Sequence, residues 1–551
     1  MKILFRNKNL HTCLVILFLI WNTYASSQNQ AWQWARSVEG SGDESVTGMA
    51  TDAQGNVYAT GFFYGSTLAV GTTTLVNAGN YDFFVIKFDP SGNLLWARSG
   101  GGIYDEVGMG ITTDGSGNAY VTGYLYSPTM VVGNFTVTNA GVGDMFAIKY
   151  NSAGTEMWAN GIGGSGEDNG TAIACDPSGN LLVTGFFKSA TLVIGTSTLT
   201  KSVGEDLCVI KLDSSGNPLW AEGFEGTGND RGNGISSDSD GNILVTGQQG
   251  GAMLILGSDT LLNSGSSDAF LTKLTSSGTV LWSRSMGGLY NDFGNSVTTD
   301  FSGNVVVTGT FNSPTLSVSS NSLLNNGGFD FFVAKYSSTG TILWAKVGGG
   351  IFDDTGYGIA TNFLGHVFVT GHFHSPSIII GSDTLFDEGI GDLYVVGYAS
   401  NGNEMWTKHL GGTADDGSGA LTCDDAGNLL LGGYFISPTV SCPEFTLTNS
   451  GNQDLLVAKL KIEYNFTGIP FSKENSLLRI YPNPSTGVFH IEAGLLEPLN
   501  VTILNELGQP VIYSSVSDTD TRIDLSDQPP GIFLVKINVG DKFLISRLIL
   551  R

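Results

Sequence analysis

The segment "SGNLLWARSGGG", residues 91–102, decides the fold because its parts recur along the chain. It reads as a turn, then a strand containing Trp96, then a glycine-rich exit. Tryptophan stands at the same place in seven successive segments, 62 residues apart: Trp34, Trp96, Trp158, Trp220, Trp282, Trp344 and Trp406. A fixed period of this length is the signature of a repeat architecture.

Other residue types keep the same period. Glycine recurs at Gly61, Gly123, Gly185, Gly247, Gly309, Gly371 and Gly433. Aspartate recurs at Asp82, Asp144, Asp206, Asp268, Asp330, Asp392 and Asp454. The chain therefore contains seven copies of one unit with no insertion between these markers.

Each copy predicts four strands separated by turns. In the first copy they are expected at about 47–52, 56–63, 82–88 and 93–99. The first pair and the last pair are joined by short Asp/Ser-Gly-Asn turns, which favour antiparallel pairing. About 18 polar, glycine-rich residues separate the second strand from the third, and we expect them to form an exposed insertion.

The last two strands of a copy carry apolar residues on both faces, so each sheet needs another layer on either side. The final copy lacks a Trp strand after 454–463, whereas the chain begins with an unpartnered one at 32–38. We predict an all-β, seven-bladed β-propeller over residues 32–463, in which 32–38 complete the last blade and close the ring. An open β-solenoid is the alternative, and it would need caps.

One tryptophan per copy, beside a small residue, predicts a packing anchor between neighbouring blades. The alternative is a ring of tryptophans that stack on a ligand. The glycine-rich first strand of each copy suits the crowded position nearest the axis.

"DPSGNLLWARSGGG", "TDGSGNAYVTGYLYSP" and "GDMFAIKYN" resemble the SBBP repeats of bacterial secreted β-propellers. The resemblance covers about residues 32–463. It implies a fold and a surface role, and it implies no reaction.

The N-terminus has the layout of a cleaved secretory signal. Basic residues precede an apolar run from about Cys13 to Trp21, and small residues follow, so residues 1–27 are expected to be removed. No later segment is apolar enough to span a membrane. With 50 acidic and 25 basic residues the net charge is −25, which argues against binding nucleic acid.

After residue 463 the repeat stops, and a linker at 464–476 leads to a segment of different pattern at 477–551. Its alternating apolar runs and Pro/Gly turns predict a small Ig-like β-sandwich. The segment resembles the C-terminal sorting domain of the type IX secretion system of Bacteroidetes. The matching elements are Tyr481, Pro482, Asn483, Pro484, Gly487, Leu507, Gly508, Asp524, Leu525, Gly531 and Arg551. The resemblance implies export across the outer membrane by that machinery and cleavage before 477, with release or lipid attachment. An ordinary accessory domain is the alternative.

An acidic position, expected at one mouth of the central channel, is the best candidate for a metal site. It is occupied by Glu44, Glu106, Asp168, Asp230, Asp292, Asp354 and Asp416. Hard cations such as Ca²⁺ take several oxygen ligands. The competing interpretation, favoured by the sevenfold repetition, is that each carboxylate accepts N–H groups from its own loop.

Three further motifs are weaker. His372 and His374 lie on one face of a strand and could form half of a metal site. The triplets 259–261 and 383–385, both Asp-Thr-Leu, resemble the O-glycosylation site used by Bacteroidetes. We find no catalytic motif, and we predict no catalytic residue and no cofactor beyond a Ca²⁺ hypothesis.

The sequence thus predicts a secreted or surface-attached, non-enzymatic propeller that binds a glycan, a protein or a matrix component. The alternative is a polysaccharide lyase or glycosidase with its site at a channel mouth. A third hypothesis is a structural role in an extracellular matrix or gliding surface. An enzyme would show one copy whose mouth-facing residues depart from the repeat.

Overall fold

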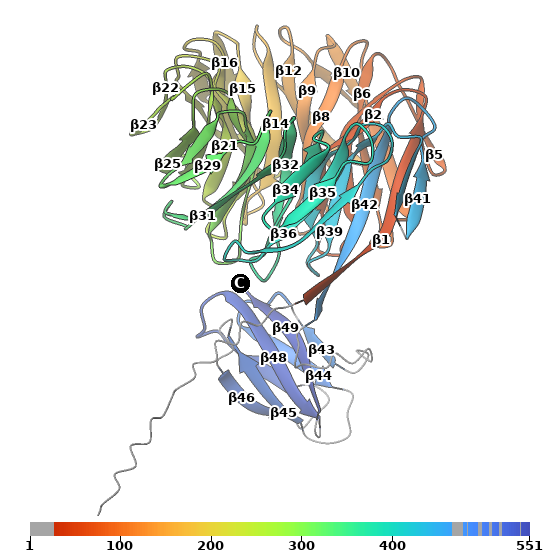
Figure 1. Cartoon of the computed structure of the whole chain (residues 1–551), viewed down its shortest axis with the longest axis vertical. Coiled ribbons are helices and arrows are strands. Elements are labelled where there is room, and N and C mark those ends of the chain that lie inside the picture. Colours follow the sequence, from red (N-terminus) through yellow and green to blue (C-terminus); the bar gives the residue numbers. More distant parts are fainter. Residues whose placement is uncertain are drawn as a thin grey trace, which may run out of the picture. The chain divides into compact units, whose positions relative to one another are not determined.

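The computed structural model describes residues 27–442, 444–465, 478–481, 483–493, 499–505, 510–516, 521–539 and 542–551. The described chain is all-β (Figure 1). It divides into a unit formed by Gln30–Glu463 and a second unit that contains the strands after Tyr464. The predicted signal 1–27 lies outside the described residues except for Ser27, as does the linker beyond 465.

The strands of the repeat form seven four-stranded antiparallel sheets in the described part of the chain. The first sheet has β2 (Glu44–Thr51), β3 (Val57–Tyr64), β6 (Tyr81–Phe88) and β7 (Leu94–Gly100). The second has β8 (Glu106–Thr113), β9 (Ala119–Leu125), β12 (Asp144–Tyr150) and β13 (Glu156–Ile162). The third has β14 (Asp168–Cys175), β15 (Leu181–Phe187), β18 (Asp206–Leu212) and β19 (Pro218–Phe224). The fourth has β20 (Arg231–Ser237), β21 (Ile243–Gln249), β24 (Asp268–Leu274) and β25 (Val280–Gly287). The fifth has β26 (Asp292–Thr299), β27 (Val305–Phe311), β30 (Asp330–Tyr336) and β31 (Ile342–Gly349). The sixth has β32 (Asp354–Thr361), β33 (Val367–Phe373), β36 (Asp392–Tyr398) and β37 (Glu404–Leu410). The seventh has β38 (Asp416–Cys423), β39 (Leu429–Phe435), β42 (Asp454–Asn465) and the N-terminal β1 (Ser27–Gly40).

The first strands of consecutive sheets contact one another in chain order, from β2 through β8, β14, β20, β26 and β32 to β38. Each of these strands has a one-residue β-bulge in its pairing with the second strand of the same sheet; in β2 the bulge lies between Val46 and Gly48. The bulged side chains link neighbouring first strands; Asn295 Nδ2, for example, donates to Gly356 O at 2.8 Å. The glycine-rich first strands therefore lie innermost, as the sequence analysis predicted.

The last sheet meets the first. Strand β38 contacts β2, and β1 is the hydrogen-bonded neighbour of β42. The Thr51 hydroxyl donates to Cys423 O at 3.3 Å, and Glu44 N donates to Gln453 O at 2.9 Å. These bonds join residues about 370 and 410 positions apart. Figure 1 shows the red N-terminal strand β1 beside the blue β42.

The core lies between adjacent sheets. Tyr58, Phe83 and Val85 of the first sheet pack against Val121 and Phe146 of the second. The second and third strands are buried on both faces because each sheet is covered on both sides. The prediction for the fourth strand was wrong, since its residue before the tryptophan, Leu95 in the first copy, is 51% exposed.

The predicted four-strand pattern agrees with the first sheet, but the insertion was predicted without strands and contains a hairpin. A turn residue at positive φ (Gly71, +56°) joins its two short strands, and the fifth copy uses Ser319 there (+53°). The hairpins are β4 (Thr67–Val70) with β5 (Thr73–Val76), β10 (Thr129–Val132) with β11 (Phe135–Thr138), β16 (Thr191–Ile194) with β17 (Ser197–Thr200), β22 (Met253–Leu256) with β23 (Asp259–Leu262), β28 (Thr315–Val318) with β29 (Asn321–Leu324), β34 (Ser377–Ile380) with β35 (Asp383–Phe386), and β40 (Thr439–Cys442) with β41 (Phe445–Thr448). Three of them extend the preceding sheet; β4 pairs with β1 in this way.

The second unit contains two antiparallel sheets around one apolar core that includes Phe489, Ile503 and Phe533. One sheet is formed by β43 (Leu478–Tyr481), β44 (Val488–Ala493) and β47 (Thr521–Asp524). The other is formed by β46 (Pro510–Val516), β45 (Leu499–Leu504), β48 (Gly531–Val539) and β49 (Lys542–Leu550).

Candidate functional site

The sheets have two ends of different character. At the turn end lie the short turns that join the first strand to the second and the third to the fourth. At the loop end lie the connections between copies and the outer hairpins. A functional site is expected at positions where the residue type differs between copies, because residues that recur in all copies are explained by the fold.

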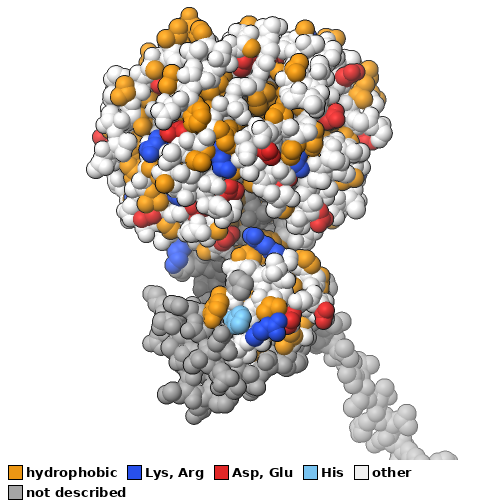
Figure 2. Space-filling model, turned by 180° about the vertical axis from the view of Figure 1, so that it is seen from behind, with side chains coloured by type: hydrophobic (Ala, Val, Ile, Leu, Met, Phe, Trp, Pro, Cys, Tyr) orange, Lys and Arg blue, Asp and Glu red, His pale blue; other side chains and the backbone are white. Residues whose placement is uncertain are grey.

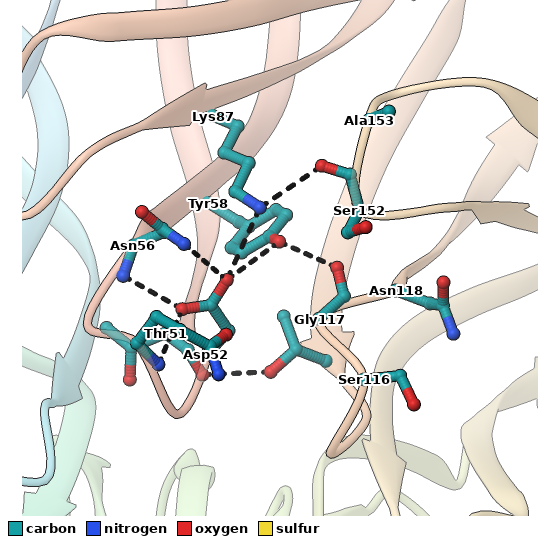
Figure 3. A network of polar contacts seen from close by, with 12 residues as sticks. Thr51, Asp52, Asn56, Tyr58, Lys87, Ser116, Gly117, Asn118, Ser152 and Ala153 are labelled. Atoms are coloured by element: carbon teal, nitrogen blue, oxygen red, sulfur yellow. Dashed lines mark hydrogen bonds and ion pairs between the residues drawn. The ribbon is translucent and has the colours of Figure 1, made fainter.

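The turn end repeats one polar network, shown for the first copy in Figure 3. Asp52 accepts bonds from Asn56 N (2.9 Å) and from the Tyr58 hydroxyl (3.1 Å), and its carboxylate lies 3.3 Å from Lys87 Nζ. Lys87 also donates to Ser152 O of the next sheet at 3.2 Å. Burial works against the charged carboxylate, but the Asn56, Tyr58 and Lys87 contacts hold the pKa of Asp52 below its usual range.

The same buried ion pair recurs as Lys211–Asp176, Lys273–Asp238, Lys335–Asp300 and Lys459–Asp424. In the sixth copy both members change together, to Asn362 and Gly397. The lysine and the acid therefore depend on each other, since a buried charge without its partner is costly.

The tryptophans of six copies, from Trp34 to Trp344, each bond their sheet to the turn of the next one. Trp282 Nε1 donates to Ser338 O at 3.1 Å, and its ring lies against Gly340, where a Cβ atom would come within 2.7 Å. The same bond joins Trp34 to Pro90 O, Trp96 to Ser152 O, Trp158 to Ser214 O, Trp220 to Ser276 O and Trp344 to Ser400 O. Trp406 is buried on β37. Their geometry is that of packing anchors.

The seven acidic candidates begin, or immediately precede, the first strands, and each is 0% exposed: Glu44, Glu106, Asp168, Asp230, Asp292, Asp354 and Asp416. They therefore do not face an open mouth. Asp354 accepts Gly350 N at 2.6 Å and the Ser375 hydroxyl at 2.7 Å, so the carboxylate closes its own loop.

Each of these acids has a second buried acid beside it, at the start of the preceding sheet's third strand. Asp330 accepts Asn326 N through Oδ2 at 2.7 Å, and its Oδ1 has no hydrogen-bond partner within the described structure. Burial, with the neighbouring Asp354, raises the pKa of Asp330 to about 7. Burial, with Asp454, raises the pKa of Glu44 to about 8. Asp330 and Glu44 therefore bind a proton at a higher pH than ordinary carboxyl groups do.

Among the described residues, no three His, Cys, Asp or Glu side chains are arranged to hold a metal ion. His374 Nε2 lies 3.1 Å from Asp415 Oδ1, and the His372 ring is tilted against the Tyr357 ring, with the centroids 5.4 Å apart. Mainly through burial, the pKa of His372 falls to about 4, so its ring is neutral. The Ca²⁺ hypothesis stays a prediction.

Thr260 and Thr384 of the Asp-Thr-Leu triplets are exposed on β23 and β35.

The loop end breaks the repeat. One position near the end of the second strand holds Phe62, Tyr124, Phe186, Gln248, Thr310, His372 and Tyr434. The position two residues later holds Tyr64, Tyr126, Lys188, Gly250, Asn312, His374 and Ile436. The position before the buried aspartate holds Tyr81, Gly143, Glu205, Ser267, Phe329, Gly391 and Gln453. Such variation between strictly repeated neighbours shows that these side chains are not required by the sheet.

Five aromatic residues at these positions form what we call the aromatic arc: Phe62, Tyr64, Tyr81, Tyr124 and Tyr126. The Tyr81 ring lies 5.1 Å from Phe62 and 5.4 Å from Tyr64, and the Tyr124 and Tyr126 rings are 5.4 Å apart. Tyr64 is 45% exposed. Acidic side chains flank the arc: Tyr126 donates to Glu167 at 2.7 Å, and the charges of Asp43 and Asp105 add to burial in raising the pKa of Tyr81. Tyrosines of this kind offer an apolar body and a polar tip to a ligand.

The aromatic arc was not predicted from the sequence. Of the residues at these variable positions, only His372 and His374 had been singled out. The sequence signal for the arc was three variable positions in otherwise repeated segments.

On the face of the larger unit drawn in Figure 2, acidic and basic side chains lie scattered among apolar ones, so that face presents no broad charged field.

In the second unit, predicted motif residues join the beginning of the domain to its last strand. Asn483 Oδ1 accepts Ile549 N at 2.8 Å, and Gly487 O accepts Leu525 N at 2.7 Å. Gly487 has φ +130°, and Gly531 begins β48. Pro484 follows Asn483, whereas Pro482 and Gly508 lie outside the described residues.

Residues 479–551 match the family described as secretion system C-terminal sorting domain. The sorting domain implies export to the cell surface or beyond by the type IX secretion system, whose machinery the domain engages. No helix among the described residues has the length and apolarity to cross a membrane.

Three further comparisons reach beyond the sorting domain. An uncharacterized WD repeat-containing protein, L264, of Acanthamoeba polyphaga mimivirus is 24% identical over 72% of this chain, which spans only 35% of that protein's length. A fungal alcohol oxidase of the AA5 family, solved with copper, has a TM-score of 0.43 at 10% identity, over 94% of this chain and 99% of that one. PorZ, a surface component of the type IX secretion system of Porphyromonas gingivalis, has a TM-score of 0.25 at 12% identity, over 92% and 81%. None of these proteins assigns an activity to this chain.

Proposed function

We propose that this chain is an exported, non-enzymatic binding protein of the cell surface, in which a seven-bladed, SBBP-type propeller (32–463) presents the aromatic arc to a ligand. Residues 1–27 are its signal peptide and 464–476 its linker. Residues 477–551 form an Ig-like sorting domain of the kind found in Bacteroidetes. The compact unit Gln30–Glu463 and the contact of β38 with β2 support these boundaries and the ring.

One observation carries the binding role. The fold-bearing positions are the same in nearly every copy, whereas the loop-end positions differ, and in the first two copies they gather five aromatic rings. Partly exposed tyrosines cost little conformational entropy to order and are favoured in binding surfaces. A protein or a glycan is the ligand class that fits such a surface.

A binding survey tests the proposal. The purified chain is applied to a glycan array and to extracellular proteins, beside a Tyr64→Ala/Tyr126→Ala variant. Tyr290→Ala, which removes an exposed tyrosine (52%) of the fifth copy, is the matched control. We expect a ligand that the arc variant loses and the control keeps. Release of reducing ends or unsaturated products from a polysaccharide would contradict the proposal.

A further inference from the structure

The interface of the third and fourth sheets shows how this fold fills its loop end. There the Phe186 ring, at the position of Phe62, is covered by the Arg231 guanidinium 4.4 Å from its centroid. Arg231 Nη2 donates to Glu205 Oε1 at 2.8 Å, and Nε contacts the other oxygen of that carboxylate. A guanidinium on an aromatic face, paired with a carboxylate, is a favourable arrangement.

A second cation completes that interface. Lys188 Nζ lies 2.6 Å from Glu167 and 2.9 Å from Glu205, and 5.6 Å from the Phe186 ring centroid. Although burial opposes its charge, bonds from Arg231 and Lys188 hold the pKa of Glu205 below its usual range. The interface of the third and fourth sheets, called the third interface below, is therefore filled by the chain's own basic residues.

The equivalent interface of the first and second sheets keeps the aromatic ring but has neither the cations nor the carboxylate that pairs with them; its acids are Asp43 and Asp105. Phe62 stands where Phe186 does, Tyr64 replaces Lys188, and Tyr81 replaces Glu205. The registers agree, since Ser45 is opposite Phe62 as Asn169 is opposite Phe186.

The position of Arg231 is taken by Val107, a short side chain that is buried on β8. No lysine or arginine of the described chain lies over Phe62, Tyr64 or Tyr81, or pairs with Asp43 or Asp105.

One carboxylate oxygen is left without a partner at this interface. Asp105 Oδ1 is buried and accepts no hydrogen bond within the described structure. Asp105 and Asp43 both act on the Tyr81 hydroxyl electrostatically, so two negative charges converge on an aromatic cluster. A buried, unpaired acceptor is costly unless a donor reaches it.

We propose that the first interface binds the guanidinium group of an arginine side chain from a partner protein, stacked among Phe62, Tyr64 and Tyr81 and bonded to Asp105. The arginine takes the place that Arg231 holds at the third interface. The inference rests on the proposed function and names the ligand chemistry of the same surface. The net charge of −25 favours approach of a basic segment.

The test uses Nα-acetyl-arginine amide as probe and Nα-acetyl-citrulline amide as its neutral isostere, with saturation-transfer NMR on the full chain. We expect transfer to the arginine side-chain protons and none to citrulline. Asp105→Asn should weaken arginine binding roughly three- to thirtyfold. Equal transfer to both probes, or full binding by Asp105→Asn, would overturn the inference.

A second variant rebuilds the closed interface. Val107→Arg/Tyr81→Glu should fill the site from within and abolish arginine binding, and its melting temperature reports whether it folds. Retained binding by the folded double variant would also overturn the inference. If arginine fails to bind while the survey ligand still depends on Tyr126, this inference falls and the proposed function stands.

Discussion

Replacing Lys273 with methionine should strongly destabilise the protein, although it changes only the end of one side chain. Lys273 Nζ lies 2.8 Å from Asp238 Oδ2, and both side chains are 5% exposed. The ammonium also donates to Ser338 O of the next sheet at 3.4 Å. Methionine keeps most of the apolar stem and leaves the Asp238 charge buried without a cation.

The magnitude follows from that uncompensated charge. Removing one partner of a buried ion pair costs about 3–5 kcal/mol of unfolding free energy. With Asp238→Asn already in place, Lys273 is itself a buried charge without its partner, so Lys273→Met should cost no more than the bond to Ser338, about 0.5–1.5 kcal/mol. The two changes should therefore couple by at least about 1.5 kcal/mol. The sixth copy, with Asn362 and Gly397, is the natural counterpart of the double variant.

The assay is urea unfolding of the four chains at pH 7, followed by tryptophan fluorescence and far-UV circular dichroism. A Lys273→Met cost below 1 kcal/mol, or equal costs in both backgrounds, would refute the reasoning.

The direction in which the pair's contribution to stability changes with pH follows from Asp238. Burial opposes its charge, but bonds from Lys273 and Asn242 lower its pKa. The pair's contribution is thus present above about pH 4 and is lost as the pH falls through the lowered value.

Three further predictions concern other parts of the chain. Because burial raises the pKa of Glu44 to about 8 and of Asp330 to about 7, the folded state holds protons that the unfolded state releases, and the melting temperature should fall as the pH rises from 6 to 9. Asp330→Asn should make this fall less steep, and a melting temperature that rises with pH would contradict the buried acid pairs. Trp282→Ala should lower the unfolding free energy by about 3–5 kcal/mol, and Gly340→Ala, at the glycine against which that ring packs, should lower it by at least about 1 kcal/mol. Urea titrations that find either change neutral would contradict a role of the tryptophan in joining neighbouring sheets. Deleting 479–551 should leave the protein inside the outer membrane, as cell fractionation would show, and normal appearance outside would contradict a sorting role.

The sheets could be predicted because the positions that build them recur. A tryptophan every 62 residues gives the strand and its packing role, and the incomplete copies at the two ends indicate how the array is arranged. The outer hairpins were missed because their strands are only four residues long and polar residues alternate in them. Turn glycines such as Gly71 were their one signal.

The candidate site was harder to predict, for two physical reasons. Variation at the position of Phe62 shows that the fold does not need a given side chain there, but it does not show which side chains converge. Tyr64 meets Tyr81 only because the hairpin between them returns the chain to the same level of the sheet. The acidic residues were expected at a channel mouth, yet Asp354 and its counterparts turn into their own loops, where N–H groups are nearer than solvent.

Everything above depends on the ring closing through the N-terminal strand, and hydrogen–deuterium exchange measures this directly. The amides of residues 34–38 on β1 should exchange as slowly as those of 96–100 on β7, because the structure gives both strands the same outer place in a four-stranded sheet. Exchange of residues 34–38 within seconds, while 96–100 stay protected, would show a free N-terminal strand and contradict the closed ring.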